Sequence, residues 1–216
     1  MLKWLAGICF VIFFAITPAK GALASYTFAS EPTVPTAANL TFGQFTRANV
    51  NQDLLAGAFR SDTWNVSGAI DTAEYVSFTI QPAANRQFTF TDLAVDLVST
   101  KKAGSHDGGP IHLDIRIFTL DGSSQLAALG DTALTANDSL KHVTWNFADL
   151  MSSAGFTVRV YGWGAENPSG ALSLDNFDVN GSVTPVPEPV NVALGLFAVV
   201  ALGVTAGRRA LEARRA

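Results

Sequence analysis

Three aromatic residues in the middle of this 216-residue chain have the type and spacing to bind a ligand. Trp64, Tyr161 and Trp163 lie near predicted loops or strand ends, and Trp163 stands between two glycines. Aromatic rings stack on the apolar faces of sugars, while Asp, Asn and Arg side chains bind the sugar hydroxyls. The three rings therefore predict a glycan-binding site. The alternative is that they pack in the core, because aromatic side chains mostly serve burial.

The sequence contains no recognisable catalytic motif. Its histidines lack helical metal-ligand spacing, and no Gly-x-Ser-x-Gly nucleophile motif is present. Ser105, His106 and Asp107 are adjacent in sequence, whereas the members of a catalytic triad converge in space. We therefore predict no catalytic residue and no enzymatic activity. An extracellular enzyme acting on polysaccharide remains the alternative.

Charge and cysteine content exclude other classes. Residues 25–184 carry eight Lys and Arg against sixteen Asp and Glu, a net charge of −8. Such an acidic segment argues against nucleic acid as a partner, because DNA and RNA binding needs a basic face. The single cysteine, Cys9, lies in the N-terminal apolar segment, so the middle of the chain forms no disulfide.

Alternating apolar and polar residues predict strands throughout the middle of the chain. The clearest runs cover residues 75–80, 88–97, 111–118, 143–147, 156–160 and 172–179, and an extra residue between Phe90 and Leu93 indicates a bulge. Gly, Pro, Asn and Asp separate the runs and mark turns. Residues 148–154 alone suggest a helical turn. We predict an all-β domain over residues 25–183, built as an antiparallel sandwich.

Residues 1–24 read as a signal peptide. Lys3 supplies a positive charge, residues 4–16 form a short apolar segment, and Ala22 and Ala24 place small residues where signal peptidase reads them. We predict cleavage after Ala24. The alternative is an uncleaved N-terminal anchor.

The C-terminal end reads as a stalk followed by a membrane anchor. Residues 184–189 contain three prolines, which favour an extended stalk. Residues 190–206 are apolar and uncharged, and as a helix rising ~1.5 Å per residue they would span roughly 25 Å. Residues 207–216 form a basic tail, which the positive-inside rule places in the cytoplasm as a stop-transfer signal. Its arginines are Arg208, Arg209, Arg214 and Arg215.

This end resembles the tripartite sorting signal of PEP-CTERM proteins. The resemblance rests on Val186, Pro187, Glu188 and Pro189, followed by the apolar span and the arginines. These are exported proteins of Gram-negative bacteria that make exopolysaccharide. The resemblance implies that an exosortase-type membrane enzyme recognises and processes the tail. The alternative is an unprocessed single-pass anchor.

The middle of the chain resembles the jelly-roll, carbohydrate-binding-like β-sandwich domains that many such proteins carry. The likeness lies in residues 71–78, 158–163 and 174–181. In related jelly rolls an acid on the closing strand ligates a structural calcium ion, and Asp175 matches that position. No cofactor is required. The alternative is that Asp175 caps a neighbouring loop through backbone N–H groups.

Together these features predict an exported protein that is anchored in the inner membrane as a precursor and then reaches the cell surface or the medium. Its expected partners are signal peptidase, an exosortase-type enzyme and polysaccharide. The expected function is glycan binding in association with exopolysaccharide or biofilm. A polysaccharide-acting enzyme and a purely structural envelope protein are the alternatives.

Overall fold

The computed structural model describes residues 21–28, 34–53, 58–100, 108–136, 138–186 and 197. The strands in these ranges are short near the N-terminus and long near the C-terminus. They are β1 (Gly21–Tyr26), β2 (Leu40–Phe42), β3 (Thr46–Ala48), β4 (Asn51–Gln52), β5 (Phe59–Asp62), β6 (Tyr75–Pro82), β7 (Arg86–Thr100), β8 (His112–Thr119), β9 (Gln125–Ala128), β10 (Thr132–Ala133), β11 (Leu140–Ser152), β12 (Phe156–Trp163) and β13 (Ala171–Pro185).

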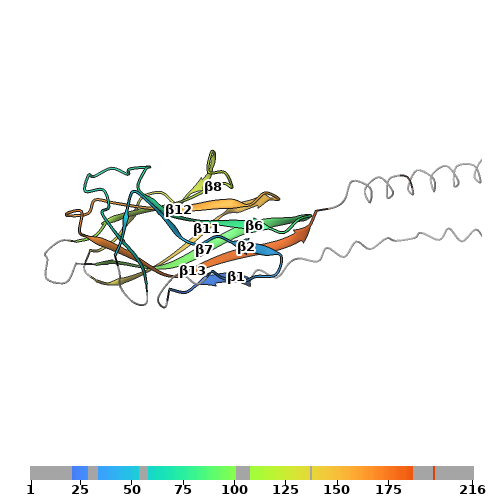
Figure 1. Ribbon diagram of the computed structural model, residues 1–216, viewed down its shortest axis with the longest axis horizontal. Coiled ribbons are helices and arrows are strands. Elements are labelled where there is room, and N and C mark those ends of the chain that lie inside the picture. Colours follow the sequence, from blue (N-terminus) through green and yellow to red (C-terminus); the bar gives the residue numbers. More distant parts are fainter. Residues whose placement is uncertain are drawn as a thin grey trace, which may run out of the picture.

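These strands form two sheets that pack face to face (Figure 1). The first sheet has the order β11-β7-β13-β5-β4, and β1 also pairs with β13. The second has the order β10-β8-β12-β6-β2, with β3 added to β6 and β9 added to β8. Every strand pair between the described strands is antiparallel. The predicted all-β antiparallel sandwich is therefore confirmed.

Alternation along each strand decides which side chains enter the core. In β6, Val76, Phe78 and Ile80 are buried, while the residues between them are only half-buried. In the neighbouring strands β8 and β12 the same period places valines, isoleucines and Phe156 inside. Because the side chains of a strand point alternately to its two faces, the remaining positions of these strands form the outer face of the second sheet.

The predicted bulge in β7 is confirmed. Its pairing with β13 shifts register where Asn180 opposes Asp92 and Gly181 opposes Phe90. The extra residue moves Leu93 onto the same buried face as Phe90. Without this shift, Leu93, Val95 and Leu97 would point away from the core.

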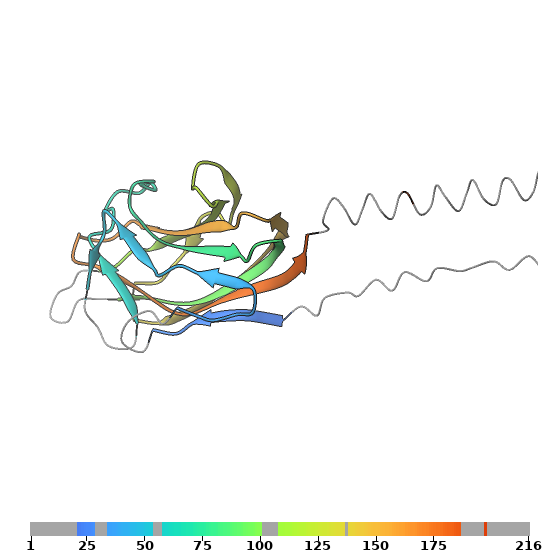
Figure 2. The same cartoon turned by 45° about the vertical axis from the view of Figure 1, so that its right-hand side comes forward.

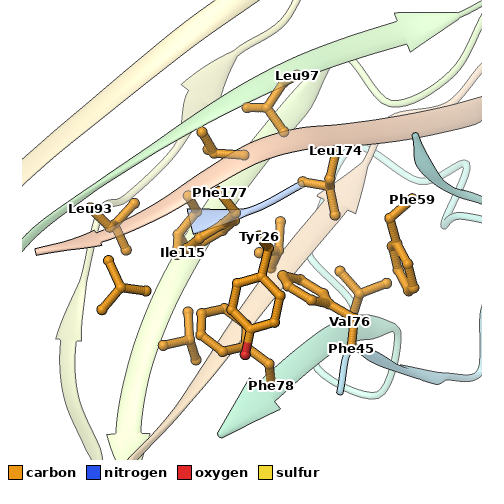
Figure 3. Packing of buried hydrophobic residues seen from close by; sticks show 14 of the residues in the cluster. Tyr26, Phe45, Phe59, Val76, Phe78, Leu93, Leu97, Ile115, Leu174 and Phe177 are labelled. Atoms are coloured by element: carbon orange, nitrogen blue, oxygen red, sulfur yellow. The ribbon is translucent and has the colours of Figure 1, made fainter. Parts of the chain in front are cut away.

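An aromatic cluster fills the sandwich at the level of β1 (Figure 3). The ring of Tyr26 lies 4.8 Å from the rings of both Phe45 and Phe78, and edge-on contacts of this kind stabilise aromatic pairs. Its hydroxyl donates a hydrogen bond to the carbonyl oxygen of Gly43. Burial raises the pKa of Tyr26 far above its ordinary value.

Two expectations about local structure are wrong. Residues 148–152 belong to β11 rather than to a helical turn, because this stretch continues the pairing of β11 with β7 after an irregularity between Asn146 and Leu150. Ile111 lies before β8 and is exposed, so the inward alternation of this run begins at Leu113.

The chain enters and leaves the sandwich at the same end, where Gly21 of β1 pairs with Gly181 of β13 (Figure 2). β1 includes the four residues before the predicted signal cleavage site, and β13 includes Pro185 of the predicted stalk. Most of the signal peptide and, apart from Phe197, the predicted span fall outside the described residues. Within the residues that the structure describes, no helix is long and apolar enough to cross a membrane.

Candidate functional site

The outer face of the second sheet carries a row of aromatic and charged side chains from its three central strands. They project from alternate positions of β6, β8 and β12, on the side away from the main core. We call this set the arginine–aromatic face, and its members are Tyr75, His112, Asp114, Arg116, Phe118, Arg159, Tyr161 and Trp163.

Arg116 is held in place by a buried carboxylate. Its Nε lies 2.6 Å from an oxygen of Asp114, which is 3% exposed. The other oxygen of Asp114 accepts a hydrogen bond from the backbone N–H of Gly130. The guanidinium carbon of Arg116 lies 5.0 Å from the centre of the Tyr161 ring. This arrangement fixes the direction of the guanidinium, which is what oriented hydrogen bonding to a ligand requires.

Arg159 lies between two aromatic rings. Its guanidinium carbon is 4.6 Å from the centre of the Tyr75 ring and 4.3 Å from that of Phe118. Burial raises the pKa of Tyr161, and a hydrogen bond with the Arg159 side chain, followed by the positive charges of Arg159 and Arg116, opposes this rise only in part. Tyr161 therefore stays protonated at neutral pH, and its hydroxyl helps to hold Arg159.

His112 and Trp163 stack at the end of the same face. Their rings lie 5.3 Å apart and are nearly parallel. A ring nitrogen of His112 lies 2.8 Å from a carboxylate oxygen of Asp131, on the loop before β10. The stacked His112 ring covers one face of Trp163, and Trp163 is only 6% exposed.

The structure brings together two of the three residues predicted to bind glycan. Tyr161 and Trp163 share the arginine–aromatic face, whereas Trp64 packs in the main core and donates its indole N–H to the carbonyl oxygen of Ser61. Trp64 and Tyr161 are each 1% exposed. The ring faces of Trp64 and Tyr161 are thus covered by other side chains, and the core interpretation describes Trp64. A ligand on this face would meet the arginines instead.

Asp175 makes the capping contacts that the alternative prediction describes. One carboxylate oxygen accepts hydrogen bonds from the backbone N–H of Asn176 and, at 3.4 Å, from that of Phe28. No group of three or more acidic, histidine or cysteine side chains suited to a metal ion occurs among the described residues. The calcium hypothesis for Asp175 thus finds no ligand set in this part of the chain.

A hydroxyl–imidazole–carboxylate chain lies on the outer face of the first sheet. The hydroxyl of Thr144 lies 3.2 Å from Nε2 of His142, whose Nδ1 lies 2.7 Å from Asp96, and Asn176 donates to the other oxygen of Asp96. Thr144 and His142 are two apart on β11, and His142 pairs with Asp96 across β11 and β7. Asn176 lies in the register irregularity of β13, next to Asp175, which pairs with Asp96. His142 is 60% exposed, so water competes for its ring nitrogens. We interpret this row of hydrogen bonds as a contact that stabilises the pairing of β11, β7 and β13.

The residues predicted to bind glycan did not include Arg116, Arg159, Tyr75 or Phe118. A signal for them was present, since Arg116 and Phe118 occupy the outward positions of the run 111–118 and Tyr75 that of the run 75–80. If the three runs had been known to be neighbouring strands, the large aromatic and cationic side chains at their outward positions would have indicated a shared face.

Comparison with known proteins gives similarity of fold only. The chain is similar to the CBM22-1 xylan-binding domain from Paenibacillus barcinonensis Xyn10C, at 15% identity over 76% of this chain and 96% of that domain, with a TM-score of 0.35. It is also similar to Caldicellulosiruptor saccharolyticus CBM27-1, solved in complex with mannohexaose, at 15% identity over 62% and 82% of the two chains, with a TM-score of 0.37.

An adhesin domain of Lys-gingipain from Porphyromonas gingivalis is similar at 11% identity over 74% of this chain and 98% of that domain, with a TM-score of 0.40. At these values the likenesses carry no argument about function. No family model matches the chain. No curated protein matches it either.

Proposed function

We propose that this chain is an exported, non-enzymatic protein of the cell surface or extracellular polysaccharide, and that it binds glycan through the arginine–aromatic face. The observation that carries the proposal is the fixed position of Arg116, between buried Asp114 and the ring of Tyr161. Binding groups that are held in place before the ligand arrives lose little entropy on binding.

The chemistry of the face suits a sugar better than an apolar ligand. The guanidinium N–H groups of Arg116 and Arg159 provide hydrogen-bond donors. The Ser77 hydroxyl, which sits opposite Arg159 on β6 and lies 3.0 Å from the hydroxyl of Thr46, adds a donor and acceptor. A guanidinium group is planar and has several N–H donors, so it can bind two neighbouring hydroxyls of one sugar. The aromatic rings beneath keep the guanidinium groups in position rather than contact the sugar themselves.

Affinity electrophoresis in gels containing single polysaccharides tests this function. A panel of neutral and acidic polymers should include at least one that slows the protein, and Arg116→Ala should weaken that binding at least tenfold, which corresponds to about 1.4 kcal/mol. Asn146→Ala is the matched control, because Asn146 is exposed on β11 of the opposite sheet. Absence of retardation by every polymer would count against glycan binding.

The same polymers separate a binding protein from an enzyme. A binding protein should release no reducing ends or shortened chains from a polymer that it retains. Release of such products by the wild-type protein, with loss of release in His142→Ala, would support the alternative of an enzyme that uses the Thr144–His142–Asp96 chain.

Export and sorting rest on the sequence alone. The features that support them are the apolar segment with Ala22 and Ala24, and the tail beginning at Val186 with its span and arginines. We propose that an exosortase-type enzyme processes this tail and that the domain then associates with exopolysaccharide. Val186 is the last residue that the structure describes before the span, and its N–H donates to the carbonyl oxygen of Asn85.

A further inference from the structure

Two arginines face each other across neighbouring strands at the centre of the arginine–aromatic face. Arg159 of β12 pairs in register with Arg116 of β8. Like charges directly opposite one another on a sheet are destabilising. Arg116 has a carboxylate partner in Asp114, whereas no ion pair joins Arg159 to a carboxylate among the described residues. The pair therefore holds one positive charge that the described part of the protein leaves unbalanced.

The surroundings of Arg159 hold its guanidinium without supplying that balance. Its guanidinium carbon lies close to the rings of both Tyr75 and Phe118. Its Nε is buried and has no hydrogen-bond partner in the part of the chain that the structure describes. Its other polar contacts are neutral: a hydrogen bond to the Tyr161 hydroxyl, and one from Nη2 to the carbonyl oxygen of Gly122 at 3.4 Å. Aromatic faces attract a guanidinium, but they do not replace hydrogen bonds at its N–H edge.

A half-buried cation without a carboxylate partner destabilises the folded state, because it loses water without gaining an ion pair. Such a cation is unexpected in a domain that is rich in carboxylates. A ligand that brings a negative group to this position would recover that cost. A carboxylate fits best, because its two oxygens match the fork of a guanidinium and can bridge two arginines. A neutral sugar would supply hydrogen bonds but no charge.

We infer that the Arg116–Arg159 pair binds the carboxylate of an acidic polysaccharide, a glycan that contains uronic acid units. This inference rests on the proposed glycan binding and names the class of glycan. The net charge of −8 of residues 25–184 repels an acidic polymer at long range. The attraction is therefore local, and it depends on the fixed guanidinium pair rather than on a basic surface.

The test compares acidic polymers with carboxyl-reduced forms of the same polymers. Alginate, polygalacturonic acid and xanthan are each offered to the full-length protein before and after reduction of their carboxyl groups to alcohols. At least one acidic polymer should bind at least tenfold more tightly than its reduced form. Arg159→Gln should remove this preference while weaker binding to the reduced polymer remains.

Two further variants separate recognition from folding. Arg159→Lys keeps the charge but loses the fork, so it should retain only part of the preference. Arg86→Gln, at the start of β7 in the other sheet, is the control and should bind like the wild type. An acidic ligand should also raise the unfolding temperature of the wild-type protein but not that of Arg159→Gln.

The outcomes show separately whether the arginine pair recognises a carboxylate and whether the protein binds glycan at all. If acidic and reduced polymers bind equally, or if Arg159→Gln keeps the preference, the carboxylate assignment is wrong while glycan binding stands. If dextran sulfate alone shows binding that depends on Arg159, the recognised group is a sulfate ester and the carboxylate assignment is again wrong. If no polymer of either kind binds, the proposed function itself fails.

Discussion

Asp96 shows how a single residue can tie together three strands. Its carboxylate accepts a hydrogen bond from Asn176 of β13 and contacts the imidazole of His142 on β11, while Asp96 itself belongs to β7. The hydrogen bond from Asn176, followed by that from His142, lowers the pKa of Asp96 below its ordinary value. The ionised carboxylate therefore stabilises the folded state.

The stabilisation by Asp96 should depend on pH in a known direction. Because its folded-state pKa is lowered, the contribution is fully present above the unfolded value of about 3.9 and is lost as pH falls through the folded value. Asp96→Asn should lower the free energy of unfolding by about 1 kcal/mol at pH 7, and the difference from wild type should shrink toward zero near pH 2. Urea unfolding across this range measures it.

Asp149→Asn is the control for Asp96, because Asp149 is exposed on the same sheet. It should leave the pH dependence of stability unchanged. An Asp96→Asn variant whose loss of stability is the same at pH 7 and pH 2 would contradict the assignment of the effect to the ionised carboxylate.

The residues of the candidate site were only partly predictable. Tyr161 and Trp163 share a face because they occupy alternate positions of one strand. The role of Arg159 was not visible, since it depends on Tyr75 and Phe118 from two other strands. Sequence alone gives the face of a strand on which a residue lies, but not which strands are its neighbours.

At the scale of elements, Gly155 makes the connection between β11 and β12. Its φ of +111° is one that residues with a side chain rarely adopt, and a Cβ there would collide with the carbonyl oxygen of Ile80 on β6. Ser152 closes the connection by accepting a hydrogen bond from the Gly155 N–H at 2.9 Å. The two strands therefore meet through a backbone shape that only glycine supplies.

Replacing Gly155 by alanine should lower the free energy of unfolding by about 2 kcal/mol, through backbone strain and the clash with β6. Gly68→Ala is the matched control, because nothing lies within 4 Å of a Cβ built at Gly68. The control should change stability by less than about 0.5 kcal/mol. Equal effects of the two substitutions, measured by thermal or urea unfolding, would show that the connection tolerates a side chain.

Strand β1 bears on the timing of signal removal. Ala24, the residue before the predicted cleavage site, pairs with Val179 of β13 and is buried. A peptidase needs an accessible, extended substrate, so we expect cleavage before β1 pairs with β13. Since β13 is the last described strand along the chain, export that starts from the N-terminus would deliver the predicted cleavage segment before its partner. Tyr26 and Phe28, which fill the core, remain after cleavage.

N-terminal sequencing of the exported protein should therefore begin at Ser25. An Ala22→Leu/Ala24→Leu double variant should block cleavage and accumulate precursor in the inner membrane, because signal peptidase needs small residues at both positions. Exported wild-type protein that keeps Met1, or that starts at another residue, would contradict the predicted site.

The strands were predictable as strands because apolar and polar residues alternate clearly along them. Where each strand begins and ends was less predictable. The bulge of β7 was visible as one extra residue between Phe90 and Leu93. Residues 148–152 were misread because an irregularity in β11 breaks the period of two that identifies a strand. Pairing partners decided the structure of this stretch, and pairing is a tertiary property.

At the scale of the whole molecule, both connections to the predicted membrane segments leave from one end of the sandwich. β1 begins and β13 ends at this end (Figure 2). The arginine–aromatic face lies on the flank of the domain, along β8, β12 and β6. Anchoring through the tail would therefore leave this face open to polysaccharide beside the domain.

The predicted sorting segment follows β13 directly in the sequence, and Glu188, which lies outside the described residues, is its most informative residue. A stalk needs only stiffness, which the prolines supply through fixed φ angles and missing N–H donors. It does not need a carboxylate next to an apolar span, where approach to the bilayer costs desolvation. We therefore propose that a cationic side chain of an exosortase-type processing enzyme recognises Glu188.

Glu188→Gln keeps the shape and stiffness of the segment and removes only the charge. If Glu188 is recognised, uncleaved precursor should accumulate in the inner membrane, while the span and Arg208 and Arg209 still fix the orientation. A Pro187→Ala/Pro189→Ala pair should have the same effect by loosening the extended backbone. Mass spectrometry of the C-terminus in membrane and medium fractions gives the readout. Unaltered tail length and location in both variants would mean that the segment is a spacer, because a recognised motif cannot lose both its charge and its backbone shape without consequence.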